Sequence, residues 1–259
     1  VELAGALGEI RRYVLKRDFR HINPEEAIVI LIEAGQRLLA SYPPELSAKA
    51  RGGLQSLGVD VRTEMMVTEI GPDSVLAGGW RIPTHTVIWA AGNRASPLLA
   101  SLGAPLDRQG RVLVDADCAV PGHPELFVVG DAANFSHDPE GTLPGVCPVA
   151  IQMGDYVAAT IRRRISGREG RPRFHYWNKG ELAVIGRGRA VANIWRLHFG
   201  GMLAWLAWIF VHIFFLIGFR NRLVVMLEWA WSYLTYSRGA RLITGLSRDQ
   251  PPPSPTEAG

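Results

Sequence analysis

The chain of 259 residues alternates apolar runs of strand length with segments of helical periodicity, which is the pattern of an α/β protein. Residues 27–32 and 86–92 predict strands that are buried on both faces. The other expected strands lie at residues 59–63, 67–70 and 75–77 and in the run that ends at Gly130-Asp131. Helices are expected at residues 1–15, 44–57 and 146–165. A chain of this length is expected to fold as two or three units.

The last part of the chain has a different pattern. Residues 199–219 carry no charge except on His212 when it is protonated, so length and apolarity make them a candidate membrane span. A second apolar stretch, residues 223–236, is shorter, contains Glu228 and is rich in Trp and Tyr, as in interfacial helices. Arginines flank both sides of the first stretch, which favours two helices lying in one leaflet over a span. Residues 247–259, with three consecutive prolines, predict a disordered tail.

Candidate cofactor chemistry lies at the ends of three expected strands. Asp131 would present a carboxylate to a polyol such as the ribityl chain of FAD. Ala91 and Gly92 are small residues where a backbone could approach a cofactor closely. Glu33 could accept hydrogen bonds from the hydroxyls of an adenosine ribose, and a solvated carboxylate explains it equally well.

The predicted helix at residues 146–165 has Pro148 in its first turn, where a missing N–H costs nothing. The positive end of its dipole would stabilise the negative charge of a reduced flavin; the alternative is an ordinary surface helix. In the first predicted helix, the small residues Ala4, Gly5, Ala6 and Gly8 would allow close packing against a strand or a ligand.

Charge and cysteine content limit the classes of partner and of site that the chain is expected to have. The net charge is +4, but residues 162–196 hold ten Lys or Arg and two Glu, so an anionic lipid surface is the expected partner of this segment. No repeated aromatic platform and no Cys/His spacing accompanies it, which argues against nucleic acid and against a metal site. Cys118 and Cys147 form no C-x-x-C pair and suit a reducing compartment, most simply as small buried thiols. Because the chain opens inside an expected helix without an N-cap residue, we expect a fragment.

Six segments together resemble the second half of the type II NADH dehydrogenases, the single-chain NADH:quinone oxidoreductases that pump no protons. They are Val1-Glu-Leu-Ala-Gly5, residues 32–39, residues 89–96, Val129-Gly-Asp-Ala-Ala133, Pro148-Val-Ala-Ile-Gln152 and residues 178–187. The resemblance implies two Rossmann-like domains of the glutathione-reductase type, for FAD and NADH, and a helical membrane-docking carboxyl-terminal segment. Both domains would be incomplete here, and the chain alone is expected to be inactive.

The resemblance also assigns roles and boundaries. Gly130, Asp131 and Ala132 would hold the FAD, with Pro148, Val149 and Ala150 behind its ring; Gln152 would line the quinone pocket. Glu33 would line the NADH ribose, and Ala91, Gly92 and Lys179 are further cofactor-binding positions. Glu2 would handle protons at the quinone, unless it only complements a helix N-terminus. The expected regions are an NADH domain at 1–88, part of an FAD domain at 89–168, a membrane-attachment region at 169–246 and the tail. The family's Ala-Gln pair is Cys147-Pro148 here.

The resemblance further implies a monotopic enzyme on the cytoplasmic face of the inner membrane, with NADH and a membrane quinone as substrates and a homodimer as one assembly. Two alternatives stay open. A sulfide:quinone oxidoreductase would need two redox cysteines, whereas Glu33 and the Lys179-Gly180 segment favour NADH. A membrane-bound nucleotide-binding fragment without catalysis is the other alternative.

Overall fold

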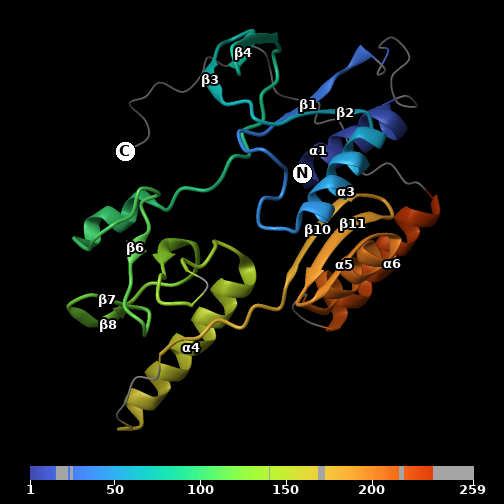
Figure 1. The fold of residues 1–259 in the computed structure, drawn as a ribbon. Helices are drawn as coiled ribbons and strands as arrows, with labels where there is room; N and C mark the ends of the chain where they lie inside the picture. The colour runs from blue at the N-terminus through green and yellow to red at the C-terminus, as the bar shows by residue number, and fades with distance from the viewer. Residues whose placement is uncertain (16–22, 24–25, 140, 169–172, 216–218, 236–259) are drawn as a thin grey trace, which may run out of the picture. The chain divides into compact units, whose positions relative to one another are not determined.

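A computed structural model describes residues 1–15, 23, 26–139, 141–168, 173–215 and 219–235, and the expected tail at 247–259 lies outside them. The chain divides into two compact units, one made of Val1–His85 with Lys179–Gly259 and the other of Thr86–Asn178. The first unit therefore joins the two ends of the sequence. Figure 1 shows the elements of each unit.

The first unit contains a β-α-β element, as the sequence predicts. Strands β1 (Val29–Ile32) and β2 (Val59–Arg62) pair in parallel, and helix α3 (Pro44–Ser56) connects them. The helix begins with Pro44 in its first turn and ends before Gly58, whose φ of +80° suits glycine. The prediction that β1 is buried on both faces is wrong, because all four of its residues are half-buried.

Helix α1 (Glu2–Glu9) continues as one π-helical segment, η1 (Ile10–Leu15), and packs on β1, β2 and α3. Ala4, Gly5 and Gly8 face inward, as expected of small residues that allow close packing, whereas Ala6, for which the same was expected, is exposed. A Cβ atom on Gly5 would collide with the carbonyl oxygen of Ile185, and one on Gly8 would lie 3.1 Å from side-chain atoms of Leu57 and Val59. The small residues therefore serve the contact between α1 and its own unit.

Antiparallel strands β3 (Val67–Ile70), β4 (Ser74–Ala77) and β5 (Trp80–Pro83) form the expected meander, with a third strand that the sequence analysis did not predict. Gly78 and Gly79 connect β4 to β5 with φ values of +56° and +81°. Positive φ at both central residues is the geometry of a type I′ hairpin turn.

A three-stranded antiparallel sheet, which the sequence analysis also missed, precedes the carboxyl-terminal helices. It consists of β10 (Glu181–Gly186), β11 (Arg189–Ile194) and β12 (Leu197–Gly201). The helices α5 (Met202–Phe215) and α6 (Phe219–Thr235) follow, and Ala204 of α5 packs against Ala190 and Ala192 of β11. Of the described residues in the apolar run at 199–219, residues 199–201 belong to β12, residues 202–215 to α5, and Phe219 begins α6. No helix among the described residues is long and apolar enough to cross a membrane.

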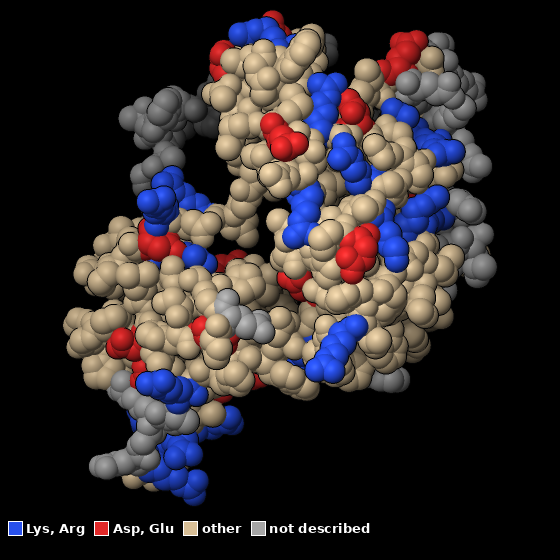
Figure 2. Space-filling model, in the orientation of Figure 1, with Lys and Arg blue, Asp and Glu red and all other residues tan. Residues whose placement is uncertain are grey.

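In the unit from Thr86 to Asn178 all described strands except β8 are very short. Parallel β6 (Val112–Leu113) and β9 (Ala133–Asn134) have two residues each, and β7 (Ala119–Val120) pairs with β8 (His123–Phe127). Two 3-10 segments, η3 (Pro97–Leu102) and η4 (Gly130–Ala132), and the long helix α4 (Cys147–Ile165) complete the unit. The last turn of α4 carries three arginines, and Figure 2 shows basic residues gathered at that end of the helix.

The predicted buried strand at residues 86–92 is wrong. These residues are exposed and irregular, and Trp89 is 63% exposed. A strand requires neighbours that satisfy its backbone N–H and C=O groups, and no described strand pairs with this segment. An apolar run of strand length is therefore not sufficient to make a strand here.

Candidate functional site

The turn that carries Asp131 packs on the start of α4. After β8 the chain runs extended through Val129 and then forms η4, with Gly130 at φ +64°. A Cβ on Gly130 would lie 3.1 Å from the Cβ of Ala150 in the first turns of α4. This close approach and the positive φ both explain glycine at position 130. The strand predicted to end at Gly130-Asp131 ends earlier, at Phe127, because a 3-10 turn intervenes.

Asp131 is exposed beside the amino-terminal end of α4. A Cβ built on Gly145 would lie 3.1 Å from its Oδ1 atom, so the carboxylate lies against the backbone just before the helix. Ala132 is half-buried and packs on the core of this unit. The exposed carboxylate can accept hydrogen bonds from hydroxyl groups of a ligand. The neighbouring helix N-terminus would stabilise negative charge that develops on another part of the same ligand. Gly145 is a member of this site that the sequence analysis missed.

Helix α4 begins at Cys147 with Pro148 in its first turn, as predicted, and its N-cap residue, Val146, makes no side-chain capping bond. Val149 is buried and anchors the helix start in the core, whereas Pro148 is exposed and Ala150 is half-buried. The first turn of α4 therefore offers an apolar outer surface on a fixed base. These residues and Asp131 fit a planar cofactor with a polyol chain.

Gln152 has two hydrogen bonds to the main chain of one residue. Its Nε2 donates to the carbonyl oxygen of Trp177 at 3.1 Å, and its Oε1 accepts from the N–H of Trp177 at 2.9 Å. The pair attaches the segment before β10 to α4. The resemblance implies only a quinone-pocket role for Gln152, and no motif in the sequence indicates this structural contact.

Ala91 and Gly92 are both exposed, and Gly92 has a φ of +112°. A Cβ on Gly92 would meet no atom within 4 Å among the described residues. The structure therefore leaves the backbone at this position open to a ligand but provides no partner that fixes it.

The two cysteines differ in their environments. Cys118 is buried, and burial together with the Asp117 carboxylate raises the pKa of its thiol to about 12. Cys147, expected to be a buried thiol, is exposed at the start of α4, because its side chain lies on the outer face of the first turn. Since the thiolate is the reactive form, Cys118 is poorly suited to redox chemistry at neutral pH.

In the other unit, Glu33 directly follows β1 at the carboxyl end of the parallel pair. Its Oε1 accepts a hydrogen bond of 2.7 Å from the N–H of Gly35, and its backbone joins Arg62 and Met65. Val1 at the start of α1 and Val29 and Leu31 of β1 pack on the same core. A half-buried carboxylate at this edge has the placement expected of a ribose ligand, and the bond to Gly35 holds its orientation.

Two further candidates lie next to the carboxyl-terminal sheet. Lys179 is exposed, and Gly180 next to it has a φ of +99°, with a would-be Cβ only 2.5 Å from the Asn193 carbonyl oxygen. Glu2 accepts a hydrogen bond of 3.0 Å at its Oε1 from the backbone N–H of Val184, in β10. Glu2 therefore links α1 to the carboxyl-terminal sheet. Within the described part of the chain, no cluster of His, Cys, Asp and Glu could hold a metal ion.

Two family models match the chain in sequence order. Residues 1–154 match the pyridine nucleotide-disulphide oxidoreductase model, and residues 178–238 match the NDH2 C-terminal domain model. The second match covers the sheet β10–β12 and the helices α5 and α6.

Curated relatives match nearly the whole chain. The chain is 38% identical to the type II NADH:quinone oxidoreductases NdhA and Ndh of Mycobacterium tuberculosis, each across 94% of this chain and 54% of the relative. The chain thus spans about half the length of the curated relatives it matches. A solved structure of NDH2 from Plasmodium falciparum in complex with NADH has a TM-score of 0.81 at 15% identity, across 90% of this chain and 63% of that chain. This likeness establishes a shared fold.

Proposed function

The chain belongs to the pyridine nucleotide-disulphide oxidoreductase family, in the branch of the type II NADH dehydrogenases, and from this premise we propose that the protein to which these residues belong is an FAD-dependent NADH:quinone oxidoreductase. The observation that carries the proposal is the order of the two family matches, an oxidoreductase segment followed by an NDH2 C-terminal domain. The names of the Mycobacterium tuberculosis relatives support the same activity.

FAD supplies the two-electron chemistry between a nicotinamide and a quinone. In the proposal, Asp131 accepts hydrogen bonds from ribityl hydroxyls, and Gly130 and Ala132 form the turn that holds it. Pro148 and Ala150 in the first turns of α4 support the ring, Val149 holds this surface from the core, and the helix dipole stabilises added negative charge. The exposure of Asp131 and its position beside Gly145 support this assignment.

Glu33 would bind the ribose hydroxyls of NADH, and the segment at Lys179 would contribute to the same site. Ala91 and Gly92, in the region expected to belong to the FAD domain, would let the backbone approach a cofactor closely. Glu2 and Gln152 would serve the quinone side, Glu2 for protons and Gln152 for the pocket. One carboxylate oxygen of Glu2 already accepts a hydrogen bond within the fold, and the Gln152 amide already bonds to Trp177. The other Glu2 oxygen and the unused hydrogen-bonding positions of the Gln152 amide are therefore the groups available for that role.

The helices α5 and α6 would dock the enzyme monotopically on an anionic leaflet at the cytoplasmic face of the inner membrane. Leu203, Leu206, Phe210 and Phe214 of α5 are each more than half exposed and recur at helical spacing. Such an exposed apolar stripe with Trp residues nearby is typical of an interfacial helix. A homodimer is compatible with this attachment. The sulfide:quinone alternative is disfavoured, because Cys118 is a buried thiol with a raised pKa.

The variant Asp131→Ala in the full-length protein tests the flavin site. We expect an intact fold and FAD affinity about 10- to 150-fold weaker, because hydrogen bonds to a carboxylate contribute about 1.5–3 kcal/mol. Asp138→Ala is the matched control, a carboxylate in the same unit outside the proposed site. Full FAD content of Asp131→Ala after gel filtration would contradict the assignment.

Glu33→Gln tests the nucleotide site. We expect the wild type to favour NADH over NADPH in kcat/KM, because a carboxylate at the ribose repels a 2′-phosphate, and the variant to lose much of this preference. An unchanged ratio would show that Glu33 only braces the loop at Gly35.

A further inference from the structure

The loop at residues 33–43, which connects β1 to α3, begins with the carboxylate of Glu33. Besides the bond of 2.7 Å from the Gly35 N–H to this carboxylate, the Gly35 carbonyl oxygen accepts one of 2.9 Å from the N–H of Glu64, just beyond β2. A Cβ on Gly35 would lie 3.2 Å from Oε1 of Glu33, so side chain and main chain fit closely here. The start of the loop is therefore fixed by bonds that include the carboxylate.

A guanidinium closes the other half of the loop. Arg37 donates through Nη1 to the Tyr42 carbonyl oxygen and through Nη2 to the Ala40 carbonyl oxygen, each at 2.8 Å. The planar guanidinium presents its donors in a rigid fork, which suits two acceptors at once. Tyr42 is buried in the core of this unit, so one of the two acceptors lies on a fixed residue. Arg37 thus ties the end of the loop to the core.

The closure spans an unfavourable backbone conformation. Leu39 has a φ of +51°, a region that bulky L residues rarely adopt. Such a conformation persists only where the surrounding contacts impose it. The two acceptors of Arg37, Ala40 and Tyr42, follow Leu39 directly, and the preceding Leu38 is buried in the core. The guanidinium and the core together therefore hold this turn.

The two arginines that flank Glu33 are both engaged within the fold. Arg37 is the only Lys or Arg among residues 33–43. Arg62 ends β2 opposite Ile32, and its Nε and Nη2 lie 2.9 and 2.8 Å from Oδ2 of Asp60. An arginine near the ribose-binding acid is what accommodates a 2′-phosphate in NADP-dependent enzymes. Here the arginine of the loop binds main-chain carbonyls instead.

We infer that Arg37 is a positioning residue of the proposed NADH site, an inference that rests on the assignment of Glu33 to the adenosine ribose. Arg37 acts through the loop, which keeps the Glu33 carboxylate in one orientation toward the ribose hydroxyls. The same closure holds the guanidinium at the carbonyls of Ala40 and Tyr42, so Arg37 takes no part in recognising a 2′-phosphate.

Steady-state kinetics of the full-length holoenzyme test the positioning role. For Arg37→Met we expect a KM for NADH about tenfold higher, the loss of roughly one hydrogen bond, with kcat within about twofold because the adenosine ribose is not the reacting end of NADH. Arg12→Met is the matched control, because Arg12 also donates to a main-chain carbonyl, that of Ser56, but outside the loop; its KM should not change. FAD content and melting temperature show that each variant is folded. An unchanged KM in Arg37→Met overturns the inference.

The variant Arg37→Lys separates the charge from the fork. Lysine retains the positive charge, but its single ammonium group does not reproduce the planar fork. We therefore expect a KM for NADH close to that of Arg37→Met. A wild-type KM in Arg37→Lys would overturn the role of the closure, and this variant decides the question if Arg37→Met does not fold.

Glu33→Gln distinguishes a failure of the inference from a failure of the proposed site. A KM for NADH that is raised in Glu33→Gln but unchanged in Arg37→Met overturns the inference alone. A KM that is unchanged in Glu33→Gln overturns the ribose assignment, and the inference falls with it.

A final arm tests whether Arg37 reaches a 2′-phosphate. In the Glu33→Gln background, where the repelling charge is absent, adding Arg37→Met is expected to weaken NADH and NADPH alike, so the ratio of their kcat/KM values should stay within about twofold. Free loop motion affects both nucleotides equally, whereas a lost phosphate contact affects only NADPH. A loss of about tenfold confined to NADPH would show that the guanidinium binds the 2′-phosphate and would overturn this part of the inference.

Discussion

The two units have apolar cores of nearly equal size, with 12 buried residues in the larger core of the first unit and 11 in that of the second, yet their backbones are organised differently. The strands of the first unit have four to six residues and lie in sheets, whereas β6, β7 and β9 of the second have two residues each. Burial of apolar side chains therefore does not by itself impose regular strands. The second unit connects its short strands through polar side chains instead.

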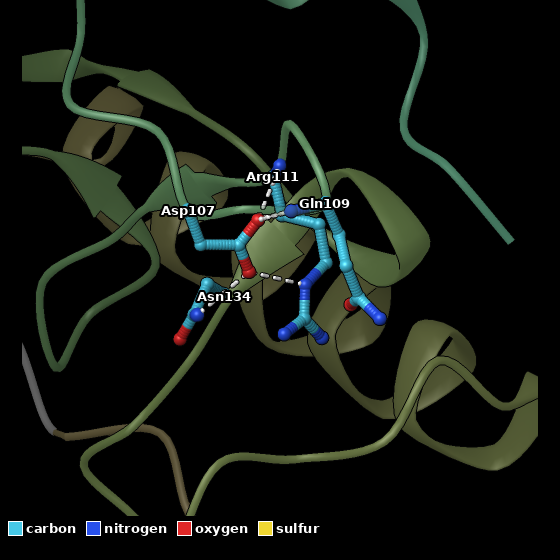
Figure 3. Close-up of polar contacts among 4 residues, drawn as sticks. All are labelled: Asp107, Gln109, Arg111 and Asn134. Atoms are coloured by element: carbon cyan, nitrogen blue, oxygen red, sulfur yellow. Dashed lines mark hydrogen bonds and ion pairs between the residues drawn. The ribbon is translucent and has the colours of Figure 1, made fainter. Parts of the chain in front are cut away.

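Asp107 is the clearest example of such a polar connection (Figure 3). Its Oδ1 accepts from the N–H groups of Gln109 and Arg111 at 2.8 and 2.9 Å. Its Oδ2 accepts from Arg111 Nε at 2.7 Å and from Asn134 Nδ2 at 2.9 Å. One carboxylate thus closes the turn before β6 and ties it to β9. The first unit has its counterpart in the contact of Gly5 with Ile185, which depends on shape alone.

The largest expected effect is that of Gly5→Ala. A new Cβ would overlap the carbonyl oxygen of Ile185 in β10, so we expect a loss of about 3 kcal/mol, although alanine favours an isolated helix by about 1 kcal/mol. Gly52→Ala in α3 is the control, because its Cβ meets nothing within 4 Å, and it should stabilise the protein. Chemical denaturation gives the sign, and hydrogen exchange should show the loss in α1 and β10. Stabilisation by Gly5→Ala would contradict the packing argument.

Asp107→Asn is expected to cost about 2 kcal/mol, confined to the second unit. Burial raises the pKa of Asp107, but hydrogen bonds from Arg111, Asn134 and Gln109 outweigh it and lower the pKa to about 2. Because this folded value lies below the unfolded value of about 3.9, the stabilisation is complete above that pH and is lost as the pH falls toward about 2.

The pH dependence of unfolding provides the measurement for Asp107. The difference between wild type and Asp107→Asn should be constant from pH 5 to about 7 and shrink below about pH 4. A difference that does not change with pH, or faster exchange in α1 and β10, would argue against a charge effect local to β6 and β9.

Gln152→Leu is expected to cost about 1–2 kcal/mol, because two hydrogen bonds to Trp177 are lost while the apolar volume is retained. Exchange of the Trp177 amide should accelerate. Gln55→Leu on the exposed face of α3 is the control. Unchanged exchange at Trp177 combined with a raised KM for quinone would favour a purely substrate-binding role.

The smallest effect is expected for Arg164→Met, at most about 1 kcal/mol. The variant loses a hydrogen bond of 2.8 Å to the Pro124 carbonyl oxygen and a cation–π contact at 4.9 Å over the Phe127 ring, both at an exposed end of α4. Arg163→Met is the matched control on the same turn. Equal melting temperatures of the two variants would show that the exposed contact contributes nothing to stability.

Elements whose signals are local could be predicted from the sequence. Pro44 and Gly58 bound α3, Pro148 begins α4, and the pair Gly78-Gly79 separates two strands, because proline and glycine restrict or widen φ whatever their surroundings. The motifs around Asp131 and Gln152 also indicated the family before any contact was known. Backbone preferences and short motifs depend on consecutive residues, so the sequence alone reveals them.

Only the tertiary structure determined which segments meet. Whether residues 86–92 form a strand depends on pairing partners, and the division of the apolar run at 199–219 depends on β11, which pairs with β12 and packs against α5. The reason that residue 5 is glycine lies 180 residues away, at Ile185. The sequence by itself determined the family, the candidate cofactor residues and the local turns. Contacts between distant residues decided the sheet pairing and the close packing. Hydrophobic residues are necessary for such contacts, but they do not specify which segments meet.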